Sequence, residues 1–151
     1  MHISNALIYK QISEEAYSNI VEITCESRKP RGDDVEGFIL QLDPKHTSFK
    51  QAMITVVFAG MWLEAVLHQK IVAKHGEAAF KKIDFKSYRD KLTLLGVSNT
   101  DLLDDVDKFK STRKELVHEK SYFDSGVIKV AQKEAELAHG IMERISVELG
   151  L

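Results

Sequence analysis

The chain has 151 residues, of which 44% are hydrophobic and 29% are charged, and its formal net charge is -2. This length suits one globular domain, and 21 basic against 23 acidic residues exclude an overall basic surface of the kind that drives nonspecific nucleic-acid binding. A single cysteine, Cys25, excludes an intramolecular disulfide and a zinc site built from cysteines.

The N-terminal part is expected to contain one helix and one loop. The sequence MHISNALIYKQISEE lacks the basic and apolar segments of a signal peptide, so we expect a cytoplasmic protein. A helix starting between Asn5 and Ser13 is predicted by apolar residues at steps of three and four, with a strand over 6–12 as the alternative. These residues are Ile8, Ile12, Ala16, Ile20 and Ile23. Residues 28–46 hold both prolines and predict a loop, in which FILQL at 38–42 forms a strand or an ordered lid.

The central helix is predicted to run from Thr47 or Ser48 to a stop at Gly76, with Ser48 and Gln51 forming a capping box. Its most apolar part, AMITVVFAGMWLEAVL at 52–67, is shorter than the ~20 residues that a bilayer needs and contains Glu64. We therefore expect a buried core helix and no membrane segment.

Further helices are predicted over 77–83, from a cap at Asp84 to Gly96, over 101–119 and over 126–149. The apolar repeat in 84–95 is Phe85, Tyr88, Leu92 and Leu95, and that in 126–149 is Ile128, Ala131, Ala135, Ala138, Met142, Ile145 and Leu149. The fold class expected is all-α, an up-and-down bundle of four or five helices. We expect one domain over 1–151, with a helix and loop at 1–46 and a helical core at 47–151.

Arg113 lies on the apolar stripe of the helix over 101–119. At ~100° per residue, its direction differs little from those of Leu102, Val106 and Phe109. A guanidinium in this place needs an internal partner, or the stripe must face a cleft or a second subunit where an anion meets it. An ion pair with Glu64 of the central helix is the internal alternative.

His118 lies five residues after Arg113, at the end of the same helix. Five helical steps put the two side chains about 140° apart. An Arg that grips a phosphate and a His that transfers a proton suffice, without a metal, for cleavage of RNA by its own 2′-hydroxyl. Because the two residues of one chain point apart, a symmetric dimer would bring two copies to one cleft. The alternative role for His118 is contact with the last carbonyls of its helix.

The sequence Arg113-Lys-Glu-Leu-Val-His118, followed by the alanine-rich helix VIKVAQKEAELAHGIMERI, resembles the HEPN domain superfamily, whose hallmark is Arg, four to six residues, then His. The resemblance covers about 47–149. It implies a small helical bundle that dimerises through its motif helices and acts as a metal-independent endoribonuclease in toxin–antitoxin or phage-defence systems. Arg113 and His118 would then be catalytic and Lys114 would face the RNA, with an antitoxin protein as a further partner.

Two readings of this site remain open. The first is the active endoribonuclease, with Glu64 supporting Arg113. The second is a catalytically inactive HEPN-like dimerisation module that binds RNA, a nucleotide or a protein, which Lys114 favours because active members usually carry Asn, Asp or His there. Glu64 and His68 stand four residues apart, but two ligands do not make a metal site, so we expect no metal and no cofactor.

Overall fold

The computed structural model describes residues 4–30, 32, 38–40, 45–118 and 131–151, and of 38–40, 117 and 118 only the backbone. The described helices are α1 (Ala6–Glu26), α2 (Thr47–His75), α3 (Glu77–Ile83), α4 (Tyr88–Leu95), α5 (Thr100–His118) and α6 (Ala131–Glu148). Two short strands, β1 (Arg28–Pro30) and β2 (Phe38–Leu40), pair in antiparallel order. The expected all-α class is confirmed. The described residues hold six helices, one or two more than the bundle predicted, because 77–83 and 88–95 form separate short helices.

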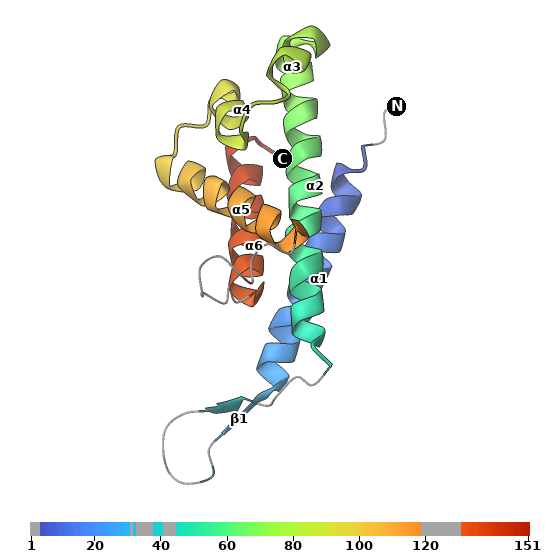
Figure 1. Ribbon diagram of the computed structural model, residues 1–151, viewed down its shortest axis with the longest axis vertical. Coiled ribbons are helices and arrows are strands. Elements are labelled where there is room, and N and C mark those ends of the chain that lie inside the picture. Colours follow the sequence, from blue (N-terminus) through green and yellow to red (C-terminus); the bar gives the residue numbers. More distant parts are fainter. Residues whose placement is uncertain (1–3, 31, 33–37, 41–44, 119–130) are drawn as a thin grey trace.

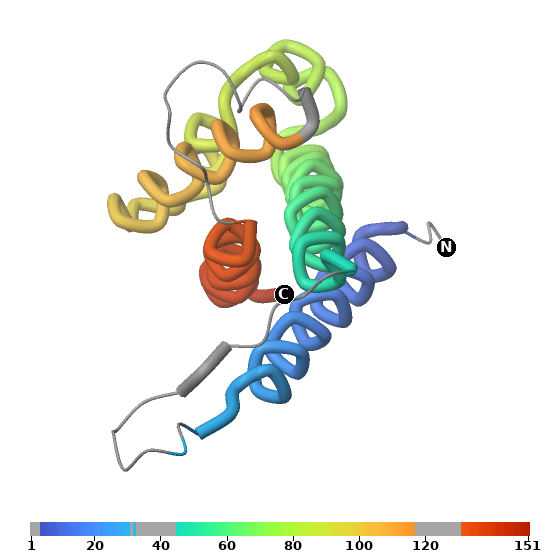
Figure 2. The backbone as a smooth tube through the Cα atoms, turned by 60° about the horizontal axis from the view of Figure 1, so that its bottom comes forward, coloured from blue at the N-terminus to red at the C-terminus, as the bar shows by residue number. Residues whose placement is uncertain are grey.

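The long helix α2 lies at the centre and contacts the other five helices (Figure 1). α1 runs antiparallel to α2, but α6 runs parallel to it: Gln132 Nε2 donates to Ser48 Oγ (3.0 Å) at their starts, and Lys70 Nζ donates to the Leu149 carbonyl (2.9 Å) near their ends. α5 lies across both helices (Figure 2). The predicted up-and-down order therefore fails at α5, which lies across α2 and α6 and not along them.

The main core lies between α2, α4, α5 and α6. Its largest fully buried side chains include Leu63, Leu67, Ile71, Leu92, Leu102, Val106, Phe109, Ile141, Met142 and Ile145. The predicted stripes of α5 and α6 are thus confirmed where the structure describes them, and Ile128 lies outside the described residues. This packing holds α5 with its Leu102, Val106 and Phe109 face inward.

α1 packs on α2 through small side chains. Its buried residues are Ala6, Ser13, Ala16 and Ile20, and the Ser13 hydroxyl donates to the Thr55 carbonyl (2.9 Å). Small residues let two helix backbones come close. Ile8, predicted to be buried, is instead 48% exposed, because the buried face follows the small residues.

The ends of α2 differ in how well they match the prediction. Gly76 ends the helix with φ +84°, a backbone conformation that favours glycine. At the start, His46 occupies the N-cap position and its side chain makes no cap hydrogen bond, so the predicted capping box of Ser48 and Gln51 is wrong. Among the described helices, α2 is long and apolar enough to cross a membrane, and half of its apolar stretch is buried inside the protein.

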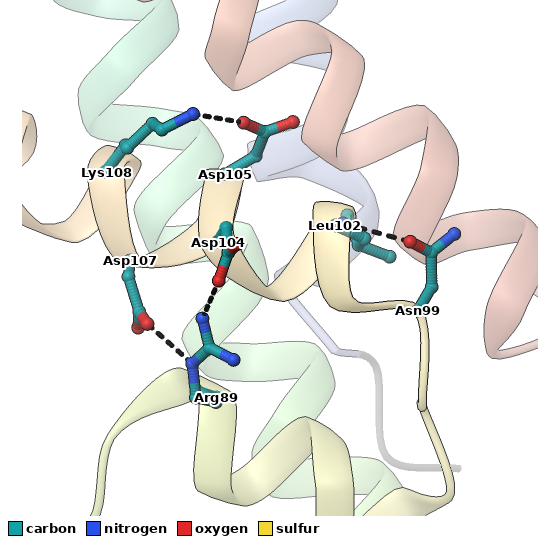
Figure 3. Close-up of polar contacts among 7 residues, drawn as sticks. All are labelled: Arg89, Asn99, Leu102, Asp104, Asp105, Asp107 and Lys108. Carbon is teal, nitrogen blue, oxygen red and sulfur yellow. Dashed lines mark hydrogen bonds and ion pairs between the residues drawn. The ribbon is translucent and has the colours of Figure 1, made fainter.

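Side-chain caps fix the short helix α4 and the start of α5. Ser87 Oγ accepts from the Asp90 amide (3.1 Å), and the Asp90 carboxylate accepts from the Ser87 amide (3.2 Å). This reciprocal cap makes α4 begin at Tyr88, so the predicted start at Asp84 is wrong. Asn99 Oδ1 accepts from the Leu102 amide (3.1 Å) and so caps α5 (Figure 3).

Candidate functional site

Arg113 of α5, Glu64 of α2 and Tyr88 of α4 form a hydrogen-bonded triad, called the Arg113 triad below. Arg113 Nη1 donates to Glu64 Oε1 (2.6 Å) and to the Tyr88 hydroxyl (2.9 Å), and that hydroxyl donates to the same Glu64 oxygen (2.6 Å). The side chain of Arg113 is 24% exposed and that of Glu64 is 52% exposed. The predicted internal partner of Arg113 is therefore confirmed, and the pair stays open to solvent.

Gly60 makes room for Arg113 against the backbone of α2. A Cβ atom placed on Gly60 would lie 2.8 Å from Arg113 Cζ and closer still to Nε and Cδ. Glycine inside a helix costs about 1 kcal/mol relative to alanine, so a buried glycine in the middle of α2 needs a structural reason. The reason here is the close passage of the arginine side chain.

Burial on this side of Arg113 leaves one donor unsatisfied. Within the described part of the chain, Arg113 Nε is buried and has no hydrogen-bond acceptor. A buried N–H group without a partner costs about 1–3 kcal/mol. The arrangement thus fixes the guanidinium without satisfying all of its donors.

The electrostatics of the triad favour its charged form. Burial alone would raise the pKa of the Glu64 carboxyl, but hydrogen bonds from Tyr88 and Arg113 outweigh it and hold this pKa below its ordinary value. Burial raises the pKa of the Tyr88 hydroxyl, and its bond to Glu64 raises it further. Tyr88 therefore stays protonated at neutral pH and orients the ion pair.

An ion-pair clamp joins α4 to α5 through Arg89, the residue after Tyr88 (Figure 3). Arg89 binds Asp104 through Nη2 and Asp107 through Nε, the latter at 2.6 Å. Each exposed pair stabilises only weakly, but two pairs from one guanidinium fix the relative position of the two helices. Fixing α4 against α5 in this way keeps the Tyr88 hydroxyl within hydrogen-bond distance of Arg113 Nη1.

The remaining predicted site residues make no printed contact with the triad where the structure describes their side chains, and His68 lines the same pocket as Glu64 and Tyr88. Lys114 is exposed on α5, and His118 is the last residue of that helix, its side chain lying outside what is described. The rings of His68 and Phe80 meet in a T-shaped contact, with 4.5 Å between their centroids. The described residues contain no group of three His, Cys, Asp or Glu side chains able to hold a metal ion.

Two residues of the site were not predicted. Tyr88 was assigned to an apolar repeat, and nothing in its local sequence marks the hydroxyl as a partner of Glu64. The sequence does hold a signal for Gly60, because an isolated glycine inside a long apolar helix indicates that another group packs closely against the backbone there.

The lowered pKa of Glu64 predicts a pH-dependent stability difference. The ionised carboxylate stabilises the folded protein above the unfolded pKa of about 4.5, and this contribution is lost as the pH falls through the lower folded pKa. Thermal unfolding should therefore show the largest gap between wild type and Glu64→Gln near neutral pH, shrinking in acid. Glu77→Gln, which removes an exposed pair with Lys81 on α3, is the control. A gap that is the same at every pH would contradict the assignment.

Comparison of the chain with protein-family models, with curated proteins and with solved structures finds no match.

Proposed function

We propose that this protein is a metal-independent endoribonuclease of the HEPN type. The observation that carries the proposal is the fixed side chain of Arg113, 24% exposed, on the helix that ends at His118. An ion pair serving stability alone gains most when all its donors are satisfied, whereas the described residues supply no acceptor for the buried Nε of Arg113. Strained or unsatisfied polar groups that a fold retains are typical of functional sites.

The proposed reaction needs only the substrate and these side chains. The 2′-oxygen of a ribose attacks the adjacent phosphorus, the bond from phosphorus to the 5′-oxygen breaks, and the products are a 2′,3′-cyclic phosphate and a 5′-hydroxyl. His118 of one subunit takes the 2′-hydroxyl proton, and His118 of the other protonates the leaving 5′-oxygen. Arg113 stabilises the charge that develops on the phosphate oxygens, and Lys114, exposed on the same helix, contacts the RNA backbone.

A homodimer supplies the second histidine. In an ideal helix, five residue steps separate two side-chain directions by about 140°, so we expect that one chain does not direct both Arg113 and His118 at one phosphate. A twofold axis near the end of α5 would place two copies of each residue around one cleft. In this setting, cytoplasmic toxin–antitoxin or phage defence is the proposed context, with an antitoxin protein as partner.

The second candidate is an inactive HEPN-like module that binds RNA, a nucleotide or a protein and contributes a dimer interface. The bonds from Arg113 Nη1 to Glu64 and Tyr88 favour it, because they give the guanidinium a structural partner in the absence of any substrate. The two candidates differ in whether the protein breaks a phosphodiester bond.

Cleavage of a defined single-stranded RNA in EDTA tests the proposal. The wild-type protein should produce fragments ending in a 2′,3′-cyclic phosphate, and Arg113→Ala and His118→Ala should not. Analytical ultracentrifugation should show a dimer. If the wild type leaves RNA intact, or if all three proteins cleave it equally, the nuclease assignment is wrong and the binding module remains.

A further inference from the structure

A pocket of about 360 Å³ opens beside the Arg113 triad. Glu64 of α2 and Tyr88 of α4 form part of its wall, so two members of the triad face it. Lys86, Lys91 and Lys110 also line it, from the segment before α4, from α4 and from α5. Its volume falls within the roughly 300–1,000 Å³ of sites for small ligands.

The charge of the pocket is positive. Against its three lysines stand two carboxylates, those of Asp84 and Glu64. Glu64 is paired with Arg113, and its pKa is held below its ordinary value by the hydrogen bonds from Tyr88 and Arg113 and by the nearby charges of Arg113 and Lys91, so it stays ionised at neutral pH. Three ammonium groups therefore face two carboxylates, an excess of one positive charge among the lining residues, and an anionic ligand would restore the balance.

Lys91 provides a fixed charge in this wall. Its side chain is 10% exposed, and Nζ donates to the Asp84 carbonyl at the end of α3 (2.7 Å), with the Asp84 carboxylate 3.6 Å away. That carboxylate is itself 68% exposed, so solvent weakens its attraction to the Lys91 ammonium. A buried ammonium with such a partner is held in place before a ligand arrives, which lowers the entropic cost of binding.

We propose that this pocket binds an RNA phosphodiester next to the one that Arg113 contacts. The inference rests on the proposed function, since it makes the pocket a substrate subsite of the same reaction. Tyr88 and Glu64 separate the two phosphate positions, and the exposed Lys110 lies one turn before Arg113 on α5, with its Nζ 5.9 Å from the centroid of the Tyr88 ring. The RNA backbone thus passes from the guanidinium over Tyr88 to the lysines.

The test uses ligands that cannot be cleaved. Amide chemical shifts of isotopically labelled protein are followed during titration with the dinucleoside monophosphate of deoxyadenosine, which carries one phosphodiester and no 2′-hydroxyl. Deoxyadenosine and 5′-AMP are titrated in parallel, to separate phosphate recognition from base recognition and a diester from a terminal monoester. The double variant Lys86→Gln/Lys110→Gln removes two exposed charges, and Lys50→Gln/Lys133→Gln removes two exposed lysines outside the pocket.

The dinucleotide should shift the amides around Tyr88 and Lys91, and the pocket double variant should bind it about tenfold more weakly, with no change in the control variant. Equal binding by the pocket variant, equal binding of deoxyadenosine, preference for 5′-AMP over the diester, or shifts elsewhere on the surface would overturn the subsite. The proposed function is judged separately: binding as expected without RNA cleavage by the wild type keeps the phosphodiester site and removes the nuclease.

Discussion

Gly60→Ala is expected to lower the rate of RNA cleavage about as much as Arg113→Ala, by ~10²- to 10³-fold, without destabilising the protein. A methyl group on Gly60 occupies the space of the Arg113 Nε, Cδ and Cζ atoms, so the guanidinium must leave its position beside Glu64. The displaced atoms belong to the far part of a flexible side chain, and the backbone of α2 can stay in place. The variant therefore moves the Arg113 guanidinium and leaves its charge unchanged.

The stability of this variant follows from two opposing terms. Alanine is favoured over glycine inside a helix by about 1 kcal/mol, and loss of the partly exposed pair between Arg113 and Glu64 costs up to about 1 kcal/mol. The free energy of unfolding should therefore stay within about 1 kcal/mol of the wild type, as measured by urea denaturation.

Gly140→Ala is the matched control, because this glycine lies inside α6 and its new methyl group would meet no atom within 4 Å. It should stabilise the protein by about 1 kcal/mol and cleave RNA at the wild-type rate. Wild-type cleavage by Gly60→Ala would show that the position of Arg113 over α2 is irrelevant to activity, and the catalytic role of the triad would be wrong.

The sequence predicts that Arg113 needs an acidic partner, but it does not predict how the fold brings that partner into contact. The 3.6-residue period places Arg113 on the same face as Val106 and Phe109, which are buried, and a charge on such a face requires a counterpart. Glu64 is the single acidic residue in the apolar part of the central helix, and so composition alone suggested the pair. The contact between them, 49 residues apart in sequence, is a property of the tertiary fold.

The local sequence pattern predicts that the Tyr88 ring is buried, but it does not predict the hydrogen bond of its hydroxyl. Its ring fits an apolar repeat whether or not its hydroxyl is bonded, and the predicted repeat also included Phe85, which is 80% exposed. The error at Phe85 comes from the helix start, because Asp84 and Ser87 are each possible N-caps and only the reciprocal bonds between Ser87 and Asp90 decide for the later start. That start places Tyr88 in the first turn of α4, facing α2.

The apolar periodicity of α6 also does not predict the direction in which this helix runs. The stripe through Ala135, Ala138 and Met142 is buried whether the helix runs parallel or antiparallel to α2, so the same pattern fits both topologies. The parallel arrangement brings the end of α6 to the end of α2, and α5 crosses the pair (Figures 1 and 2). Arg113 reaches Glu64 because of that crossing, which positions the second half of α5 over the middle of α2.

Phe109→Ala is expected to destabilise the protein by about 3–5 kcal/mol, the largest change in stability that we predict. Phe109 is 1% exposed and is among the largest fully buried side chains of the core. Truncation removes its apolar contacts and leaves a cavity that the surrounding helices fill only in part. Because small domains are stable by about 5–15 kcal/mol, the urea midpoint should fall by a large fraction while the slope of the transition stays unchanged.

The exposed Phe85 is the control for Phe109, and Phe85→Ala should change the free energy of unfolding by no more than about 0.5 kcal/mol. Phe109 precedes Arg113 by one turn, so release of α5 from the core also separates Arg113 from Glu64. Phe109→Ala should therefore cleave RNA in buffer in proportion to its folded fraction and lose activity along its own, lower urea transition. Gly60→Ala should instead cleave ~10²- to 10³-fold more slowly while fully folded. A loss below about 1 kcal/mol would mean that Phe109 does not anchor α5, and the core assigned around this helix would be wrong.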